Sequence, residues 1–258
     1  MPQGLIPFEI DTDMAKSLFR SWIRKKWFVS PKLKRELKVR KFHSVYVPFW
    51  TFDADFYCDY VAHRGYFRGD APKGDIRFGD KTLGQMTRQV DWELVSGELE
   101  AKHNDIYVVA AKGLPEFYID RLEPWDLSKL QAFQNEYVSG YHIQKYQIDL
   151  AQGFKKAKEK GKDRVKLLIY GEVGGDTQKL GSMEIRYSNI QFRHILLPLF
   201  VCSYSFKEVN YQFVVNGQTK EVQGKAPKSA LQIILFVSVI VMAVIIFVGF
   251  VYFSNMQL

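Results

Sequence analysis

The stretch VYVPFWTFDADFYCDY, residues 45–60, decides the fold class of this chain. From Trp50 to Tyr60 every second residue is apolar or aromatic. The positions between carry three carboxylates: Asp53, Asp55 and Asp59. Because successive side chains of a strand point to opposite faces, this alternation predicts a long strand, or a bent strand pair, with one buried face. Pro48 cannot donate to a neighbouring strand, so we expect it at an edge, a bulge or the strand's beginning.

The rest of the chain adds helices and further strands to this one. Alternating segments predict strands over residues 88–100, 164–170, 183–193, 195–206, 211–215 and 219–223. Helical spacing predicts a helix over 13–28, a short helix from Pro31, helical turns near 115–122 and 127–133, and a helix over 147–160. Asn216-Gly217 is typical of a two-residue type I′ turn between strands. The sequence therefore predicts an α+β fold, with a mainly antiparallel sheet and N-terminal and middle helices.

The C-terminal segment IILFVSVIVMAVIIFVGFVYF, residues 233–253, contains no charged residue. A helix of this length rises about 30 Å, the thickness of the hydrocarbon core of a bilayer. A buried helix of a soluble protein normally keeps a polar stripe, which is missing here. We therefore predict a C-terminal transmembrane helix over residues 230–253. Its anchor residues are Ile233, Phe236, Ile240, Ile245, Phe247, Phe250 and Tyr252.

The charges beside this segment predict its orientation. Lys220, Lys225 and Lys228 precede it, and the tail 254–258 has no basic residue. The positive-inside rule then predicts a single-pass protein of the cell membrane with its body in the cytoplasm and its tail outside. We interpret residues 1–224 as a soluble body, 225–229 as a basic linker, 230–253 as the span and 254–258 as an external tail. The body is either one domain or two similar β subdomains, 1–110 and 160–224, joined by a helical middle.

Positive charge gathers on the predicted helices. Residues 13–41 contain 11 Lys and Arg and 2 Asp and Glu, so their net charge is +9. This exceeds the net charge of +8 of the whole chain. The expected contact residues are Arg20, Arg24, Lys25, Lys26, Lys32, Lys34, Arg35, Lys38, Lys155, Lys156 and Lys158. They predict attraction to the anionic head groups of the bilayer. Nucleic-acid binding is the alternative, although the helical spacing of Trp22 and Trp27 favours core positions over base stacking. A solvated face without a ligand is a third interpretation.

Other residues give weaker indications of chemistry. Asp53, Asp55 and Asp59 share one strand face and could hold a hard cation, although a face paired with arginines such as Arg64, Arg68, Arg77 or Arg88 is the favoured interpretation. The five histidines lack the spacing of a metal site. Two cysteines, Cys58 and Cys202, are interpreted as buried, reduced thiols. No cofactor and no enzymatic activity are expected, because no complete catalytic or nucleotide-binding motif occurs.

Two stretches resemble each other: VPFWTFDADF at 47–56 and LPLFVCSYSF at 197–206. Each has an aliphatic residue, a proline, two bulky apolar residues and an alternating segment that ends in phenylalanine. This pattern fits an internal duplication, and it equally fits two unrelated buried strands.

Several segments together resemble a known family. They are IPFEID at 6–11, SLFRSWIRKKWF at 17–28, VYVPFWTFDAD at 45–55, LEPWDLSKL at 122–130, YVSGYHIQKY at 137–146 and LLPLFVCSYSFKEVNYQFVVNGQT at 196–219. In this order they resemble bacterial zinc-ribbon-containing proteins of the transcription-factor-IIB type. Some of those are labelled primosomal protein N-prime or superfamily II helicase.

This chain departs from the family's pattern in one large way. Members often begin with a CxxC…CxxC ribbon, and this chain starts where such a ribbon would end. The resemblance therefore assigns no zinc ligand here. A helicase would need a phosphate-binding GxxxxGK[ST] loop, which the sequence lacks. We expect a membrane-anchored cytoplasmic binding or scaffold protein, with a membrane-tethered nucleic-acid-binding protein linked to replication or transcription as the alternative.

Overall fold

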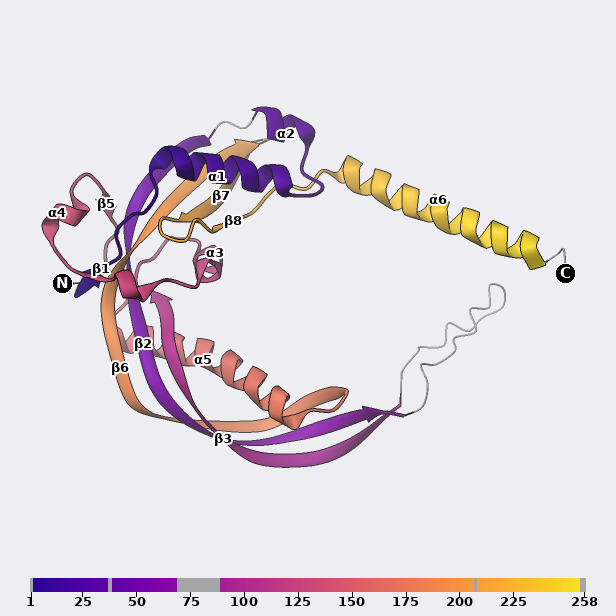
Figure 1. Ribbon diagram of the computed structural model, residues 1–258, viewed down its shortest axis with the longest axis horizontal. Helices are drawn as coiled ribbons and strands as arrows, with labels where there is room; N and C mark the ends of the chain where they lie inside the picture. The colour runs from indigo at the N-terminus through magenta and orange to yellow at the C-terminus, as the bar shows by residue number, and fades with distance from the viewer. Residues whose placement is uncertain (1, 37–38, 69–88, 207, 256–258) are drawn as a thin grey trace. The chain divides into compact units, whose positions relative to one another are not determined.

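The computed structural model describes residues 2–36, 39–68, 89–206 and 208–255 (Figure 1). It confirms the α+β class, with a large, mostly antiparallel sheet and an apolar C-terminal helix. The strands are β1 (Gly4–Leu5), β2 (Val39–Phe67), β3 (Val90–Val109), β4 (Gln131–Ala132), β5 (His142–Ile143), β6 (Thr177–Phe206), β7 (Val209–Asn216) and β8 (Val222–Gly224). The helices are α1 (Thr12–Lys25), α2 (Pro31–Glu36), α3 (Glu116–Ile119), α4 (Asn135–Val138), α5 (Leu150–Val173) and α6 (Ala230–Asn255), with 3₁₀ turns at Asp120–Leu122 and Leu127–Lys129.

Three long strands, β2, β3 and β6, dominate the sheet, whose strand order is β3-β2-β6-β1-β4. The sequence predicted separate strands over 183–193 and 195–206, but β6 runs without a break through both. Pro48 also lies inside β2, and not at its beginning. Proline removes a donor but keeps its carbonyl, and the Pro48 oxygen accepts a hydrogen bond of 2.8 Å from the Ala110 N–H. The strand can therefore continue through the proline.

The chain divides into two compact units. Unit 1 contains Met1–Phe49, Val109–Gln147 and His194–Leu258, and unit 2 contains Trp50–Val108 and Ile148–Arg193. Each unit is discontinuous in sequence, since the long strands β2 and β6 each contribute one part to unit 1 and the other to unit 2. The subdomains expected from the sequence, 1–110 and 160–224, were continuous segments.

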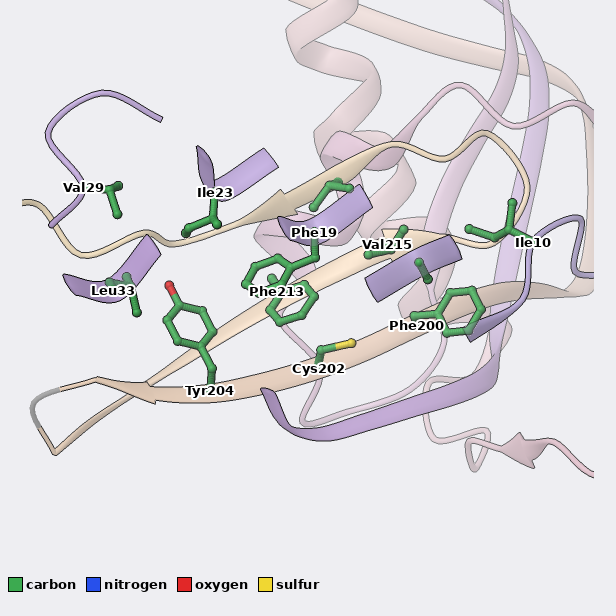
Figure 2. Close-up of a cluster of buried hydrophobic side chains, with 12 residues drawn as sticks. Ile10, Phe19, Ile23, Val29, Leu33, Phe200, Cys202, Tyr204, Phe213 and Val215 are labelled. Atoms are coloured by element: carbon green, nitrogen blue, oxygen red, sulfur yellow. The ribbon is translucent and has the colours of Figure 1, made fainter. Parts of the chain in front are cut away.

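Helix α1 covers the strands β6 and β7 in unit 1. Its buried side chains Ala15, Phe19 and Ile23 recur every four residues and face the sheet. The Phe19 ring stacks on Phe213 with centroids 3.5 Å apart, and Tyr204 packs beside it at 5.6 Å (Figure 2). Burying such aromatic side chains stabilises this unit by about 2–3 kcal/mol each.

Helix α5 covers the alternating part of β2 in unit 2. The predicted alternation is confirmed, because Phe56, Cys58 and Tyr60 are buried against Val165 and Ile169 of the helix. The strand predicted over 164–170 is wrong, since these residues continue α5. The buried stripe of α5 recurs every four residues, as a helix requires: Gly153, Ala157, Gly161, Val165, Ile169 and Val173. The helix predicted over 147–160 is therefore confirmed as the first part of α5, although the residues buried there are glycine and alanine.

The two halves of the chain repeat one arrangement, in which a short strand and a helix precede a long strand and its antiparallel partner. Asp11 caps α1 by accepting from the Met14 N–H at 2.7 Å, and Asp149 caps α5 by accepting from the Gln152 N–H at 2.8 Å. In both helices the first buried residue, Ala15 or Gly153, stands four positions after the cap.

The same backbone pairings then occur twice, each time between opposite halves. β1 pairs in parallel with β6, Leu5 opposite Leu196, and β5 pairs in parallel with β2, Ile143 opposite Tyr46. The next residue donates in both cases: Ile6 N–H to the Leu196 oxygen at 3.0 Å, and Gln144 N–H to the Tyr46 oxygen at 2.9 Å.

Three residues further on, the pairing continues in step. Glu9 N–H donates to the Gly217 oxygen at 2.9 Å, and Gln147 N–H donates to the Ala110 oxygen at 2.8 Å. Gly217 and Ala110 themselves donate to the oxygens of Pro198 and Pro48, each at 2.8 Å. The two prolines of the resembling stretches thus occupy equivalent positions, and each half supplies the strand and helix that complete the other half.

The turn predicted at Asn216-Gly217 is different in the structure. β7 ends at Asn216 and β8 begins at Val222, so the connection is longer than two residues. The Asn216 side chain holds it by accepting from the N–H groups of Gln218 and Thr219. Gly217 does not adopt the positive φ that a type I′ turn needs, whereas Lys220 does, at 69°.

Candidate membrane interface

The basic face of α1 ends at a tight turn. Arg20, Arg24 and Lys25 are exposed on the side of the helix opposite the core. The Lys26 N–H closes the last turn on the Ile23 oxygen, and the chain then leaves the helix. Phe28 has a φ of 60°, a conformation that costs a residue with a Cβ about 1 kcal/mol or more. At Phe28 the chain changes direction, and the residues that follow contact the C-terminal part of unit 1.

Three contacts join this turn to the start of α6. Val29 forms an antiparallel bridge with Lys228, and the Ser229 N–H donates to the Phe28 oxygen at 2.6 Å. The Phe28 ring meets the ring of Phe236 edge-on, with centroids 5.3 Å apart. The turn between α1 and α2 therefore lies against the first turns of the C-terminal helix.

Trp27 precedes Phe28 in this turn, and their rings meet edge-on with centroids 6.5 Å apart. The sequence favoured a core position, since Trp27 follows Ile23 by four residues, but its side chain is 78% exposed. The reason is that α1 ends at Lys25, so the helical spacing no longer applies to Trp27. Trp22 behaves as predicted, because it packs against the core beside Phe19. The neighbouring Lys26 ammonium lies 4.7 Å above the Trp22 ring.

Most of the other predicted contact residues surround this turn. Lys32 is exposed on α2, and the Lys34 ammonium donates to the Arg24 oxygen at 2.9 Å, which ties α2 to the end of α1. Lys225 and Lys228 are exposed just before α6. Arg35 belongs to α2, but its side chain lies outside the described part, as does Lys38. Val29 and Leu33 hold the inner side of this segment in the core of unit 1.

The remaining basic residues of the prediction lie on α5, in unit 2. Lys155 is exposed, Lys156 is half-buried, and Lys158 lies 5.1 Å from the Phe154 ring centroid. The described structure places these three residues in a different unit from the basic residues of α1 and α2. Within unit 1, the described contacts with the start of α6 come from the turn between α1 and α2.

Helix α6 is long and apolar enough to cross a membrane, and among the described residues it alone has this property. Its window Ala230–Phe247 has no residue buried inside the structure. Of the predicted anchor residues, four are exposed: Phe236, Ile240, Ile245 and Phe247. Ile233 is half-buried, and the side chains of Phe250 and Tyr252 lie outside the described part. So large an exposed apolar surface needs a partner other than water.

The three aspartates of β2 are paired with residues of β6 and β3. Asp53 accepts from the guanidinium of Arg193 at 2.9 Å, Asp55 accepts from the Asn189 amide at 2.7 Å, and Asp59 pairs with Arg186. The hydrogen bond from Asn189, followed by the charge of Lys102, lowers the pKa of Asp55. Pairing was the favoured interpretation, but with other arginines than those named from the sequence. The described residues contain no group of three or more His, Cys, Asp or Glu side chains arranged to hold a metal ion.

The buried polar and thiol groups include one residue that the sequence did not indicate. His103 is almost fully buried, its ring stacks on Phe56 at 4.4 Å, and its Nε2 atom has no hydrogen-bond partner. Burial, followed by the charge of Arg164, lowers the pKa of His103. Cys58 and Cys202 are buried free thiols, which confirms their interpretation, and burial raises the pKa of both.

Comparison with known proteins identifies one kind of relative. The chain is 26% identical over 229 residues to the uncharacterized protein YdjG of Bacillus subtilis, an alignment that covers 88% of this chain and 64% of YdjG. The chain thus spans less than two thirds of the length of this relative. No family model matches the chain, and no solved structure matches it. The resemblance to zinc-ribbon-containing proteins stays a prediction.

Proposed function

We propose that this protein is a single-span membrane protein whose body lies on the cytoplasmic side and acts by binding, as a scaffold at the membrane surface. The observation that carries the proposal is the exposed apolar surface of α6. Fifteen or more Leu, Ile, Val and Phe side chains in such a helix favour insertion by several kcal/mol, at roughly 0.3–0.6 kcal/mol each. The orientation is supported by Lys225 and Lys228, which stand directly before α6.

A first experiment tests the anchor. The full-length chain is expressed and the broken cells are spun at high speed, with a variant that ends at residue 224 as the control. Full-length protein should sediment with membranes and leave them only with detergent, whatever the salt concentration. Full-length protein that stays in the supernatant without detergent would remove the basis of the proposal.

A second experiment tests the orientation with single cysteines in a chain whose Cys58 and Cys202 are replaced by alanine. Glu136→Cys places a thiol on an exposed body residue, and Ser254→Cys places one in the tail. A thiol reagent that cannot cross membranes should label Ser254→Cys in intact cells and Glu136→Cys only after lysis. The reverse pattern would put the body outside the cell.

One observation favours a second candidate function. Trp27 is exposed among lysines, and an exposed aromatic side chain next to basic residues can stack on a base of single-stranded nucleic acid. A membrane-tethered nucleic-acid-binding protein would therefore use the same turn. The lipid interpretation has more support, because the turn contacts α6 directly.

A further inference from the structure

Comparison of the two halves shows how many residues the fold needs to connect the helix to the following long strand. In the second half, α5 ends at Val173 and β6 begins at Thr177, so residues 174–176 are enough. In the first half, α1 ends at Lys25 and β2 begins at Val39, so the corresponding connection runs from residue 26 to residue 38. The first half therefore carries additional chain between its helix and its long strand, and that chain contains Trp27 and α2.

This additional segment has an inner and an outer side of different character. Val29 and Leu33 are buried and attach the segment to the core of unit 1. The outer side carries the exposed Trp27 with Lys25 and Lys32 on either side of it in the sequence. An exposed tryptophan beside lysines matches the boundary of a membrane, where indole rings and basic side chains concentrate.

The contact with α6 sets the depth of the segment. Phe236 follows Ile233, the first residue of the apolar run 233–253, by three residues, which is about 4.5 Å along the helix axis. If the run fills the hydrocarbon core, Phe236 lies just inside the boundary. The Phe28 ring, with its centroid 5.3 Å from that of Phe236, then lies within 5.3 Å of this depth, and Trp27 is the adjoining residue.

We propose that the turn at Trp27 is a second membrane contact, in which the indole enters the interface of the leaflet and Lys25, Lys26 and Lys32 bind anionic lipid head groups. This proposal rests on the proposed function, since it requires α6 to span the bilayer. It assigns the extra segment one task, which is to hold unit 1 against the leaflet at a fixed depth. A single helix without such a contact would leave its attached domain free to rotate.

The test uses the full-length chain in vesicles of phosphatidylcholine whose acyl chains carry bromine, which quenches nearby tryptophans, with and without anionic phosphatidylglycerol. Trp27→Phe should lose most of the quenching that the wild-type protein shows. Trp92→Phe is the matched control: it also removes one exposed tryptophan, but from β3 in unit 2, and should keep the wild-type quenching. Equal quenching in both variants would overturn the proposal.

A second arm tests the lysines. In the triple variant Lys25→Gln, Lys26→Gln, Lys32→Gln, the quenching of Trp27 should fall in anionic vesicles and approach its level in neutral ones. No difference between triple variant and wild type would overturn the anionic-lipid part. Quenching of Trp27 by a single-stranded oligonucleotide, with none by the brominated lipid, would overturn the proposal in favour of nucleic acid.

Flotation of every variant with the vesicles separates this proposal from the proposed function. Each variant keeps α6, so each should float with lipid even where the Trp27 contact is lost. A wild-type chain that floats but shows no quenching of Trp27 contradicts only the second contact. A wild-type chain that fails to float contradicts the anchor itself.

Discussion

Replacing Gly153 by alanine should destabilise the protein, whereas the same replacement at Gly171, in the same helix, should stabilise it. A Cβ at position 153 would stand 2.6 Å from Cδ1 and 3.2 Å from Cγ of Trp50. The Trp50 ring cannot move away freely, because its Nε1–H donates to the Ile148 oxygen at 2.9 Å in a buried hydrogen bond. At Gly171 nothing lies within 4 Å of the added Cβ.

Two opposing terms give the magnitude. Alanine favours the helical backbone over glycine by about 1 kcal/mol at either position. Forcing one methyl group into a filled core costs about 1–3 kcal/mol, a cost that applies only at position 153. Gly153→Ala should therefore lose up to about 2 kcal/mol net, once helix propensity has offset part of the strain. Gly171→Ala should gain about 0.5–1 kcal/mol.

The assay is thermal unfolding of the full-length chain in detergent micelles, followed by circular dichroism. For a protein of this size about 1 kcal/mol corresponds to a change in Tm of roughly 2–4 °C. We expect Gly153→Ala to melt below the wild type and Gly171→Ala above it. If both variants melt higher, α5 does not pack on Trp50, and the assignment of this helix to the sheet of unit 2 is wrong.

Three further perturbations follow from the fold. Asp11→Ala and Asp149→Ala each remove an N-cap of the repeat and should each cost about 1 kcal/mol in unfolding experiments, while serine at either position should restore most of the loss. Phe19→Ala should cost about 3–5 kcal/mol, because the ring is fully buried on Phe213, and Phe19→Leu should cost clearly less. Burial lowers the pKa of His103 below the value of 6.5 that we expect in the unfolded chain. Its neutral form therefore contributes stability that is fully present above pH 6.5 and is lost as the pH falls through the folded pKa. The melting temperature of His103→Gln should accordingly fall less between pH 7 and pH 5 than that of the wild type, and an equal fall would contradict this role.

The sequence predicted those elements whose core face is made of large apolar side chains. The alternation through Trp50, Phe56 and Tyr60 places one residue in two on the buried face, and the structure buries each of them. The helix α1 could be predicted for the same reason, since Phe19 and Ile23 are large apolar residues on its buried side. Both patterns are local, so they survive without knowledge of what the element packs against.

The parts that the sequence missed depend on distant partners. The first part of α5 was predicted, as a helix over 147–160, but its continuation was not, since Gly161 of the buried stripe carries no apolar signal. Its C-terminal half, with Val165 and Ile169, then looked like a strand. The exposure of Trp27 was predicted wrongly for a different reason. The helix α1 ends two residues before Trp27, and helix ends are the least certain part of a sequence-based prediction.

Each half of the chain packs its short strand and helix on the other half. This explains how the basic N-terminal helix comes to lie beside the C-terminal helix α6. α1 belongs to the first half, but it packs on β6 and β7 of the second half, and β7 leads through β8 directly into α6. The bridge between Val29 and Lys228 therefore joins segments from opposite ends of the chain without any additional linker. If α1 packed instead on strands of its own half, Phe28 would have no reason to meet Phe236 of α6. The proposed membrane contact is thus a consequence of the exchanged arrangement, and evidence against the pairing of β1 with β6 would count against that contact as well.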